Sequence, residues 1–199
     1  PSVELTVHLE NRAKDHRLRI LFPSGIQEAE WSYAEGQFDV LQRPIQLPPA
    51  EGWKETPYPT HPMWNFVDVS DGQNGFAVIN DGLTEYEVMD DKERTLAITL
   101  LRAFGKFVFE RPTPGSQCLG HHVYRFALYP HTGHWSDSEV FALTARQITP
   151  VQALYSAPTR GHLPGRMSFF SLSDDTLVFS GMKQSEDGKS LVLRFWNPT

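Results

Sequence analysis

The sequence predicts a mainly β protein, an antiparallel β-sandwich with one short helix, from three observations. Apolar and polar residues alternate with period two in seven short segments, at residues 3–9, 17–22, 75–79, 95–101, 122–129, 176–182 and 191–196. Glycine turn signals lie between strand segments, at Asp71-Gly72, Asp81-Gly82 and Asp187-Gly188. Only one segment has a helical pattern. Many short, closely spaced strands indicate an all-β sandwich with mostly antiparallel pairing.

The predicted helix covers residues 136–147. Ser136 and Glu139 have the spacing of a capping box, in which each side chain accepts a backbone N–H of the first turn. Val140, Leu143 and Ile148 fall roughly on one face of this helix.

Two segments do not follow the strand pattern. Residues 44–62 contain six prolines, which cannot supply ladder N–H groups, and we expect an extended arm over the surface. Residues 156–166 are expected to form another loop. Long ordered loops are more often functional or interfacial than idle, so both are candidates for contact with something outside this chain.

The composition argues against binding to nucleic acid or to a membrane. The chain has 199 residues, 24 acidic against 18 basic, and no Lys/Arg cluster that could dock on nucleic acid or an anionic membrane. The longest apolar stretch, residues 96–101, is too short to span a bilayer. The single cysteine, Cys118, cannot close an internal disulfide, which favours a reducing compartment and a cytoplasmic location.

The length and the ends of the sequence bear on domain organisation. About 40% apolar composition over 199 residues is enough to form one core. The chain enters directly into strand pattern without an initiator methionine, and it stops directly after an apolar run. We therefore expect residues 1–199 to be a single β-sandwich domain cut from a longer chain, with residues 166–199 beginning or bordering a following β unit.

Glu85 and Glu87 are the first candidates for catalytic residues. Glycosidases use two carboxylates roughly 5 to 9.5 Å apart, and residues two apart on a strand lie about 6.5 to 7 Å apart. Catalytic carboxylates must approach the sugar from opposite sides, whereas strand neighbours project in parallel. A structural or interface role on an acidic hairpin is therefore the preferred interpretation.

A zinc site is the next candidate, built from His121, His122, His131 and His134 with Cys118 upstream. The spacing does not match paired structural zinc ligands, and adjacent histidines on a strand point to opposite faces. Cys118 also lacks the surroundings of an activated nucleophile, so we expect a buried, apolar thiol. By composition and spacing alone, the chain is a soluble acidic sandwich without a self-contained active site.

Several segments resemble the carboxy-terminal region of the family-38 glycoside hydrolases, the α-mannosidases, and especially the bacterial type that includes mannosylglycerate hydrolases. The resemblance rests on residues 16–26, 66–88, 96–105, 112–135 and 180–198, which match in order and span nearly the whole chain. Trp196 stands where relatives often have Tyr before Asn-Pro, a departure that leaves the fold assignment intact.

The resemblance implies a galactose-mutarotase-like supersandwich and a parent enzyme with a retaining mechanism. In this family an amino-terminal barrel holds a zinc ion and the catalytic carboxylates, and none of those motifs has a matching position here. The resemblance thus implies no catalytic residue, no metal ligand and no cofactor in this chain. The implied partners are the barrel of the same polypeptide and a mannoside substrate.

The edge that would meet the barrel or border its sugar cleft is expected at residues 80–88 and the corner Asp90–Lys92. The candidates for that role are Asn80, Asp81, Glu85, Tyr86 and Lys92, because clustered polar groups need partners once an interface covers them.

Two other functions remain open. A free-standing carbohydrate-binding module would use exposed aromatic side chains such as Trp53, Trp64 or Trp135 as a stacking platform. A self-sufficient small hydrolase would use Glu85 and Glu87.

Overall fold

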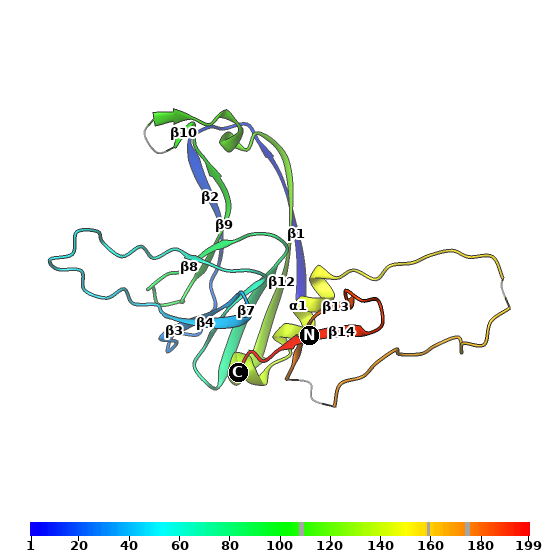
Figure 1. The fold of residues 1–199 in the computed structure, drawn as a ribbon. Helices are drawn as coiled ribbons and strands as arrows, with labels where there is room; N and C mark the ends of the chain where they lie inside the picture. The colour runs from blue at the N-terminus through cyan, green and yellow to red at the C-terminus, as the bar shows by residue number, and fades with distance from the viewer. Residues whose placement is uncertain (108–109, 159, 174–175) are drawn as a thin grey trace.

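The computed structural model describes residues 1–107, 110–158, 160–173 and 176–199. Two antiparallel sheets pack face to face, which confirms the predicted sandwich (Figure 1). The larger sheet contains, in spatial order, β1 (Val3–Asn11), β12 (Gly120–Thr132), β7 (Asn74–Asn80), β6 (Phe66–Ser70), β3 (Trp31–Gly36) and β4 (Asp39–Pro44). The smaller sheet contains β2 (His16–Phe22), β9 (Leu96–Ala103), β8 (Glu85–Val88) and β5 (His61–Pro62).

Two short ladders lie outside these sheets. One pairs β10 (Lys106–Phe107) with β11 (Arg111–Pro112), next to the 3-10 turn η2 (Pro114–Gln117). The other pairs β13 (Val178–Gln184) with β14 (Leu191–Trp196).

The main core lies between the two sheets, because alternate residues of each strand point inward. In β1, Leu5, Val7 and Leu9 pack against this core while their neighbours are exposed. The core draws on both sheets, and its fully buried members include Val67, Val69, Val78, Tyr86, Leu96, Ile98 and Phe126. Burial of each large apolar side chain contributes about 1.5–3 kcal/mol relative to exposure.

A second apolar cluster lies on the opposite face of the larger sheet. It is covered by α1 (Val140–Ile148) and the 3-10 turn η3 (Trp135–Asp137), and its buried members are Phe66, Ala77, Ile79, Ala127, Tyr129, Trp135 and Val140. The middle of the larger sheet is therefore covered on both faces. For this reason all five positions of β6 are buried and its sequence does not alternate.

The predicted helix is present but starts later, because η3 occupies the first turn of the predicted range. The predicted capping box is wrong. Glu139 is the N-cap residue of α1 and its side chain makes no capping bond, while the hydroxyl of Ser138 accepts from the Val140 amide at 3.3 Å. The predicted apolar face is right for two of its three residues: Val140 is buried and Leu143 packs against the second apolar cluster, but Ile148 is exposed.

All seven predicted strands are present, with ends shifted by at most three residues. The strands that the alternation did not predict are β3, β4, β5, β6, β8, β10 and β11. Most of them are short, covered on both faces or interrupted by polar residues, and so lack the half-buried alternation that marks a strand in sequence. β8 does alternate, but it has only four residues.

Two of the three predicted turns close hairpins, and the third does not. Asp71 Oδ1 accepts the amides of Gln73 and Asn74 and so closes the β6–β7 turn. The Asp187-Gly188 turn joins β13 to β14. The segment at Asp81-Gly82 connects β7 of the larger sheet to β8 of the smaller one, so the acidic hairpin expected at residues 80–88 is wrong. It is a crossover between the layers.

Two long segments project from the sandwich on opposite sides in Figure 1. The first, residues 46–60 in cyan, is largely exposed and lies between β4 and β5, as the prolines predicted. The second, residues 150–158 and 160–173 in yellow to orange, is longer than the predicted loop and carries highly exposed apolar side chains: Val151, Leu154, Tyr155, Leu163 and Phe169. In the described part of the chain, no helix is long and apolar enough to cross a membrane.

Candidate functional site

Glu85 and Glu87 project from the outer face of the smaller sheet, while Tyr86 between them points into the core. This confirms that the two carboxylates lie in parallel on one side. The Glu85 carboxylate accepts from Arg17 at 2.8 Å and from Arg102 at 2.9 Å.

Glu87 is held in the same way by Arg19, the next outward arginine of β2. The hydroxyl of Thr99, on β9 between these strands, also donates to Glu85 at 2.7 Å. Two ionic contacts therefore run in parallel across the outer face, from β2 over β9 to β8.

The charge partners of Glu85 decide its protonation state. Burial raises the pKa of its carboxyl, but the Thr99 hydrogen bond and the charges of Arg17 and Arg102 together outweigh burial and leave the pKa lowered. A general acid in a glycosidase needs the opposite change, a raised pKa. Glu85 is therefore built as an anionic anchor for two arginines.

Asn80 lies at the start of the crossover and is fully buried. Its side-chain oxygen accepts the Leu83 amide at 2.6 Å, and its side-chain nitrogen lies 3.4 Å from the Trp64 carbonyl and 3.3 Å from the Asn65 carbonyl. One side chain therefore fixes both the crossover and the segment that precedes β6.

The other three residues predicted for this edge differ in how exposed they are. Tyr86 is buried, and its hydroxyl contacts the hydroxyl of Ser32 at 3.1 Å and the guanidinium of Arg43 at 3.1 Å. Asp81 and Lys92 are exposed. Of the five candidates, only these two present their side chains fully to solvent at this edge.

The aspartates in the corner after β8 bind groups within the same corner. Asp91 accepts from the amide and the hydroxyl of Thr95 at 3.0 and 2.8 Å, and Arg94 binds the Asp90 carboxylate. Both aspartates therefore have partners within the domain and do not depend on an interface to satisfy them.

The histidines and the cysteine that were considered as zinc ligands do not lie together around one point. His122 contacts the Cys118 carbonyl at 2.7 Å, His121 is exposed on the edge of β12, and His134 contacts the Ser136 hydroxyl. Cys118 is partly buried against the core rather than fully buried. Within residues 1–107, 110–158, 160–173 and 176–199, no three His, Cys, Asp or Glu side chains are grouped so that they could hold a metal ion.

A buried ionisable pair was missed by the sequence reasoning. His131 Nε2 lies 2.7 Å from Asp68 Oδ2, and both side chains are almost completely inaccessible. Gly75 lies beneath the imidazole, where a Cβ atom would come within 2.1 Å of the ring. Asp68, a charged residue in the middle of the apolar strand β6, was the sequence feature that could have indicated a buried ion pair.

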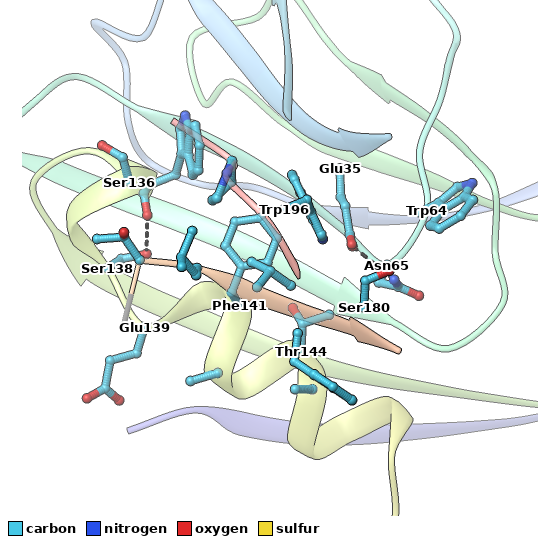
Figure 2. A pocket seen from close by; sticks show the side chains of 18 of the residues that line it. Glu35, Trp64, Asn65, Ser136, Ser138, Glu139, Phe141, Thr144, Ser180 and Trp196 are labelled. Atoms are coloured by element: carbon cyan, nitrogen blue, oxygen red, sulfur yellow. Dashed lines mark hydrogen bonds between the residues drawn. The ribbon is translucent and has the colours of Figure 1, made fainter. Parts of the chain in front are cut away.

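A pocket of about 940 Å³ lies between the β3–β4 turn, α1 and the β13–β14 ladder (Figure 2). Its walls include Glu35, Trp64, Asn65, Phe141 and Trp196. The pocket joins residues far apart in sequence, so spacing could not have predicted it.

The tryptophans considered from the sequence as stacking residues differ in exposure. Trp135 is buried in the second apolar cluster. Trp53 is exposed on the projecting arm, and Trp64 is exposed beside the pocket.

Comparisons with known proteins agree with this architecture. The family model "Glycosyl hydrolases family 38 C-terminal domain" matches residues 1–106. A putative mannosylglycerate hydrolase of Halalkalibacterium halodurans is 31% identical over 98% of this chain, and human alpha-mannosidase 2C1 is 28% identical over 90%. The crystal structure of an alpha-mannosidase from Enterococcus faecalis V583 superposes with a TM-score of 0.87 at 29% identity over the whole chain.

Each of these proteins is much longer. The chain spans 21% of the Halalkalibacterium protein, 16% of the human protein and 22% of the Enterococcus structure.

Proposed function

The chain belongs to glycoside hydrolase family 38, within the C-terminal domain of that family, and from this premise we propose that it is the non-catalytic sandwich domain of a larger α-mannosidase. The parent enzyme would hydrolyse the O-glycosyl bond of an α-mannoside by a retaining mechanism. Support comes from relatives named as a mannosylglycerate hydrolase and an alpha-mannosidase, of which the chain corresponds to about a fifth.

One observation carries the non-catalytic role. The only neighbouring glutamates that suggested a glycosidase pair project in parallel and are bound by Arg17, Arg102 and Arg19. A retaining glycosidase needs one carboxylate free to attack and another that holds a proton at neutral pH. Glu85, with its lowered pKa and two arginine partners, can do neither.

The catalytic groups of the parent are therefore assigned to an amino-terminal barrel, together with the zinc ion that the family resemblance implies. The described residues do not fit a zinc site, since their His, Cys and acidic side chains are not grouped for coordination. No step of the reaction is assigned to this chain.

The domain would support the barrel through its crossover edge. Asp81 and Lys92 are exposed there and are the contact residues in this proposal. Asn80, Tyr86 and Glu85 would act indirectly, because their side chains hold the crossover, the core and the two arginines in place. This edge would border the sugar cleft or the barrel beside it.

Exposed apolar groups support contact with further parts of a longer polypeptide. The segment 150–173 exposes Val151, Leu154 and Tyr155 almost completely. The β13–β14 ladder exposes Met182, Leu191 and Leu193. The ladder packs on α1 and the β3–β4 turn through Trp196, but a two-stranded ladder has little core of its own, so we assign residues 166–199 to the start or border of a following β unit.

The test uses the full-length parent enzyme. Asp81→Ala combined with Lys92→Ala should change kcat or KM for an aryl α-mannoside, or lower the midpoint of thermal unfolding. The matched control is Glu10→Ala with Arg12→Ala, an exposed acid and base outside both the crossover edge and residues 166–199. If the Asp81/Lys92 variant matches the native enzyme in turnover and thermal stability, this edge does not meet the barrel or cleft.

A further inference from the structure

The pocket between α1 and the β13–β14 ladder has the size and form of a ligand site. Its volume of about 940 Å³ lies within the usual range of small-molecule clefts, roughly 300 to 1,000 Å³. Its walls come from the end of β3 with its turn, Trp64 and Asn65 before β6, η3 with the two residues that follow it, α1, and residues 176–180 with Trp196. Figure 2 shows Phe141 and Trp196 in the middle of the pocket, with Glu35, Asn65 and Trp64 along one side.

Aromatic rings form the apolar part of the lining. Phe141 and Trp196 meet edge to face with ring centres 5.5 Å apart, and Phe38 meets Trp196 in the same way at 6.3 Å. Trp64 and Phe38 are 46% and 53% exposed, so their rings are open to an incoming ligand. Exposed aromatic faces of this kind can stack on the apolar face of a sugar ring.

Phe38 has an unusual backbone conformation. Its φ of 59° lies in the left-handed region, which is rare for a bulky side chain. Its phenyl ring lies at the pocket, against Trp196 and with the Arg194 guanidinium 5.4 Å from the ring centre. Strained residues of this type occur preferentially at binding sites.

A buried carboxylate and an amide supply the polar part. Glu35 is 8% exposed, and its Oε2 accepts from the side-chain amide of Asn65 at 2.9 Å. Burial raises the pKa of Glu35, although the hydrogen bonds from Asn65 oppose it. The hydroxyl of Thr144, which also lines the pocket, is buried without a hydrogen-bond partner among the described residues.

This polar group is held rigidly before any ligand arrives. The amide of Trp64 donates to the Glu35 carbonyl at 2.8 Å, and the Asn65 carbonyl accepts from the backbone amide of Asn80 at 2.7 Å. Preorganised groups of this kind lower the entropic cost of binding.

We propose that this pocket binds a neutral saccharide. The apolar face of one sugar ring would pack on Trp64, and adjacent hydroxyls would donate to Glu35 and accept from Asn65. Asp137 and Glu139 also line the pocket beside a single arginine, Arg146, so the local charge disfavours an anionic ligand. This proposal rests on the residues that line the pocket and does not depend on whether the domain supports a barrel.

Isothermal titration of the chain with α-mannobiose, maltose and lactose tests the proposal, with Trp fluorescence as a second readout. At least one disaccharide should bind saturably. Trp64→Ala and Glu35→Gln should each weaken that binding at least tenfold. Trp53→Ala is the matched control, an exposed tryptophan on the arm, and it should leave binding unchanged.

Two outcomes would overturn the inference. One is the absence of saturable binding by all three disaccharides in a chain whose circular dichroism shows the folded state. The other is saturable binding that Trp64→Ala leaves within twofold of native, which would place the sugar elsewhere. Trp64 is half exposed, so its removal tests the pocket without threatening the fold.

Discussion

The side-chain amide of Asn80 lies 3.3 Å from the backbone carbonyl of Asn65 and links the crossover between the sheets to the wall of the pocket. The same side chain accepts the Leu83 amide. A residue at the proposed barrel edge therefore also positions Trp64 and Asn65. Any variant at Asn80 will act on both regions through the fold.

Asn80→Ala should lower the free energy of unfolding by roughly 2–4 kcal/mol, because it removes the capping acceptor and leaves buried backbone groups without a partner. Urea denaturation of the chain measures this loss. Asp81→Ala, at the exposed neighbour, should stay within about 0.5 kcal/mol of native. Equal losses for the two variants would show that the Asn80 contacts contribute little.

Replacing Glu85 by Gln should lower stability by only about 1 kcal/mol, since the ionic contacts are partly exposed and Arg102 is 64% exposed. The Glu85 pKa is lowered in the folded chain, so its contribution is present above the ordinary value of 4.5 and is lost as the pH falls through the folded value. Urea unfolding at pH 7 and pH 3 should show the native–variant difference shrinking in acid. A difference that grows in acid would contradict the ion-pair account.

Gly75→Ala should destabilise the chain, since a Cβ there would come within 2.1 Å of the His131 ring. In a His131→Ala background the same change should cost at least 1 kcal/mol less, because the ring is gone. A double-mutant cycle by urea unfolding measures this coupling. Additive losses would show that the imidazole does not occupy the space above Gly75.

The His131–Asp68 pair should make stability depend on pH. Burial lowers the pKa of His131, but the hydrogen bond and charge of Asp68 outweigh it and raise that pKa above the ordinary 6.5. Burial also raises the pKa of Asp68. Both groups hold protons more tightly in the folded chain, so the stabilisation by His131 is fully present below about pH 6.5 and is lost as the pH rises through the folded value.

His131→Gln, which keeps a polar side chain without the titration, provides the comparison. The difference in unfolding free energy between the native chain and this variant should be larger at pH 6 than at pH 9. A difference that is constant or increases with pH would contradict a charged His131 in the folded state.

The alternation predicted the longer strands, both the half-buried ones and the mostly buried β7 and β9. In β1 and β2 one face meets the core and the other meets solvent, so the alternation is visible. It failed for β6, which α1 and the opposite sheet cover from both sides. It also failed at the crossover, because Asp81-Gly82 has the composition of a hairpin turn and nothing local shows that β8 joins the other sheet.

For the candidate site, too, the sequence predicted local geometry but not contacts between strands. The parallel projection of Glu85 and Glu87 follows from strand geometry alone and was predicted correctly. Their arginine partners come from β2 and β9, and the pocket combines Glu35 with Trp196, so these depend on pairing that a single sequence does not show.

The central claim is that this domain supports an α-mannosidase without containing its active site. The most direct measurement is hydrolysis of an aryl α-mannoside by the 199-residue chain with added zinc, beside the full-length parent enzyme under the same conditions. The account predicts turnover by the parent and none by the chain alone. Turnover by the chain alone that Glu85→Gln abolishes would contradict it.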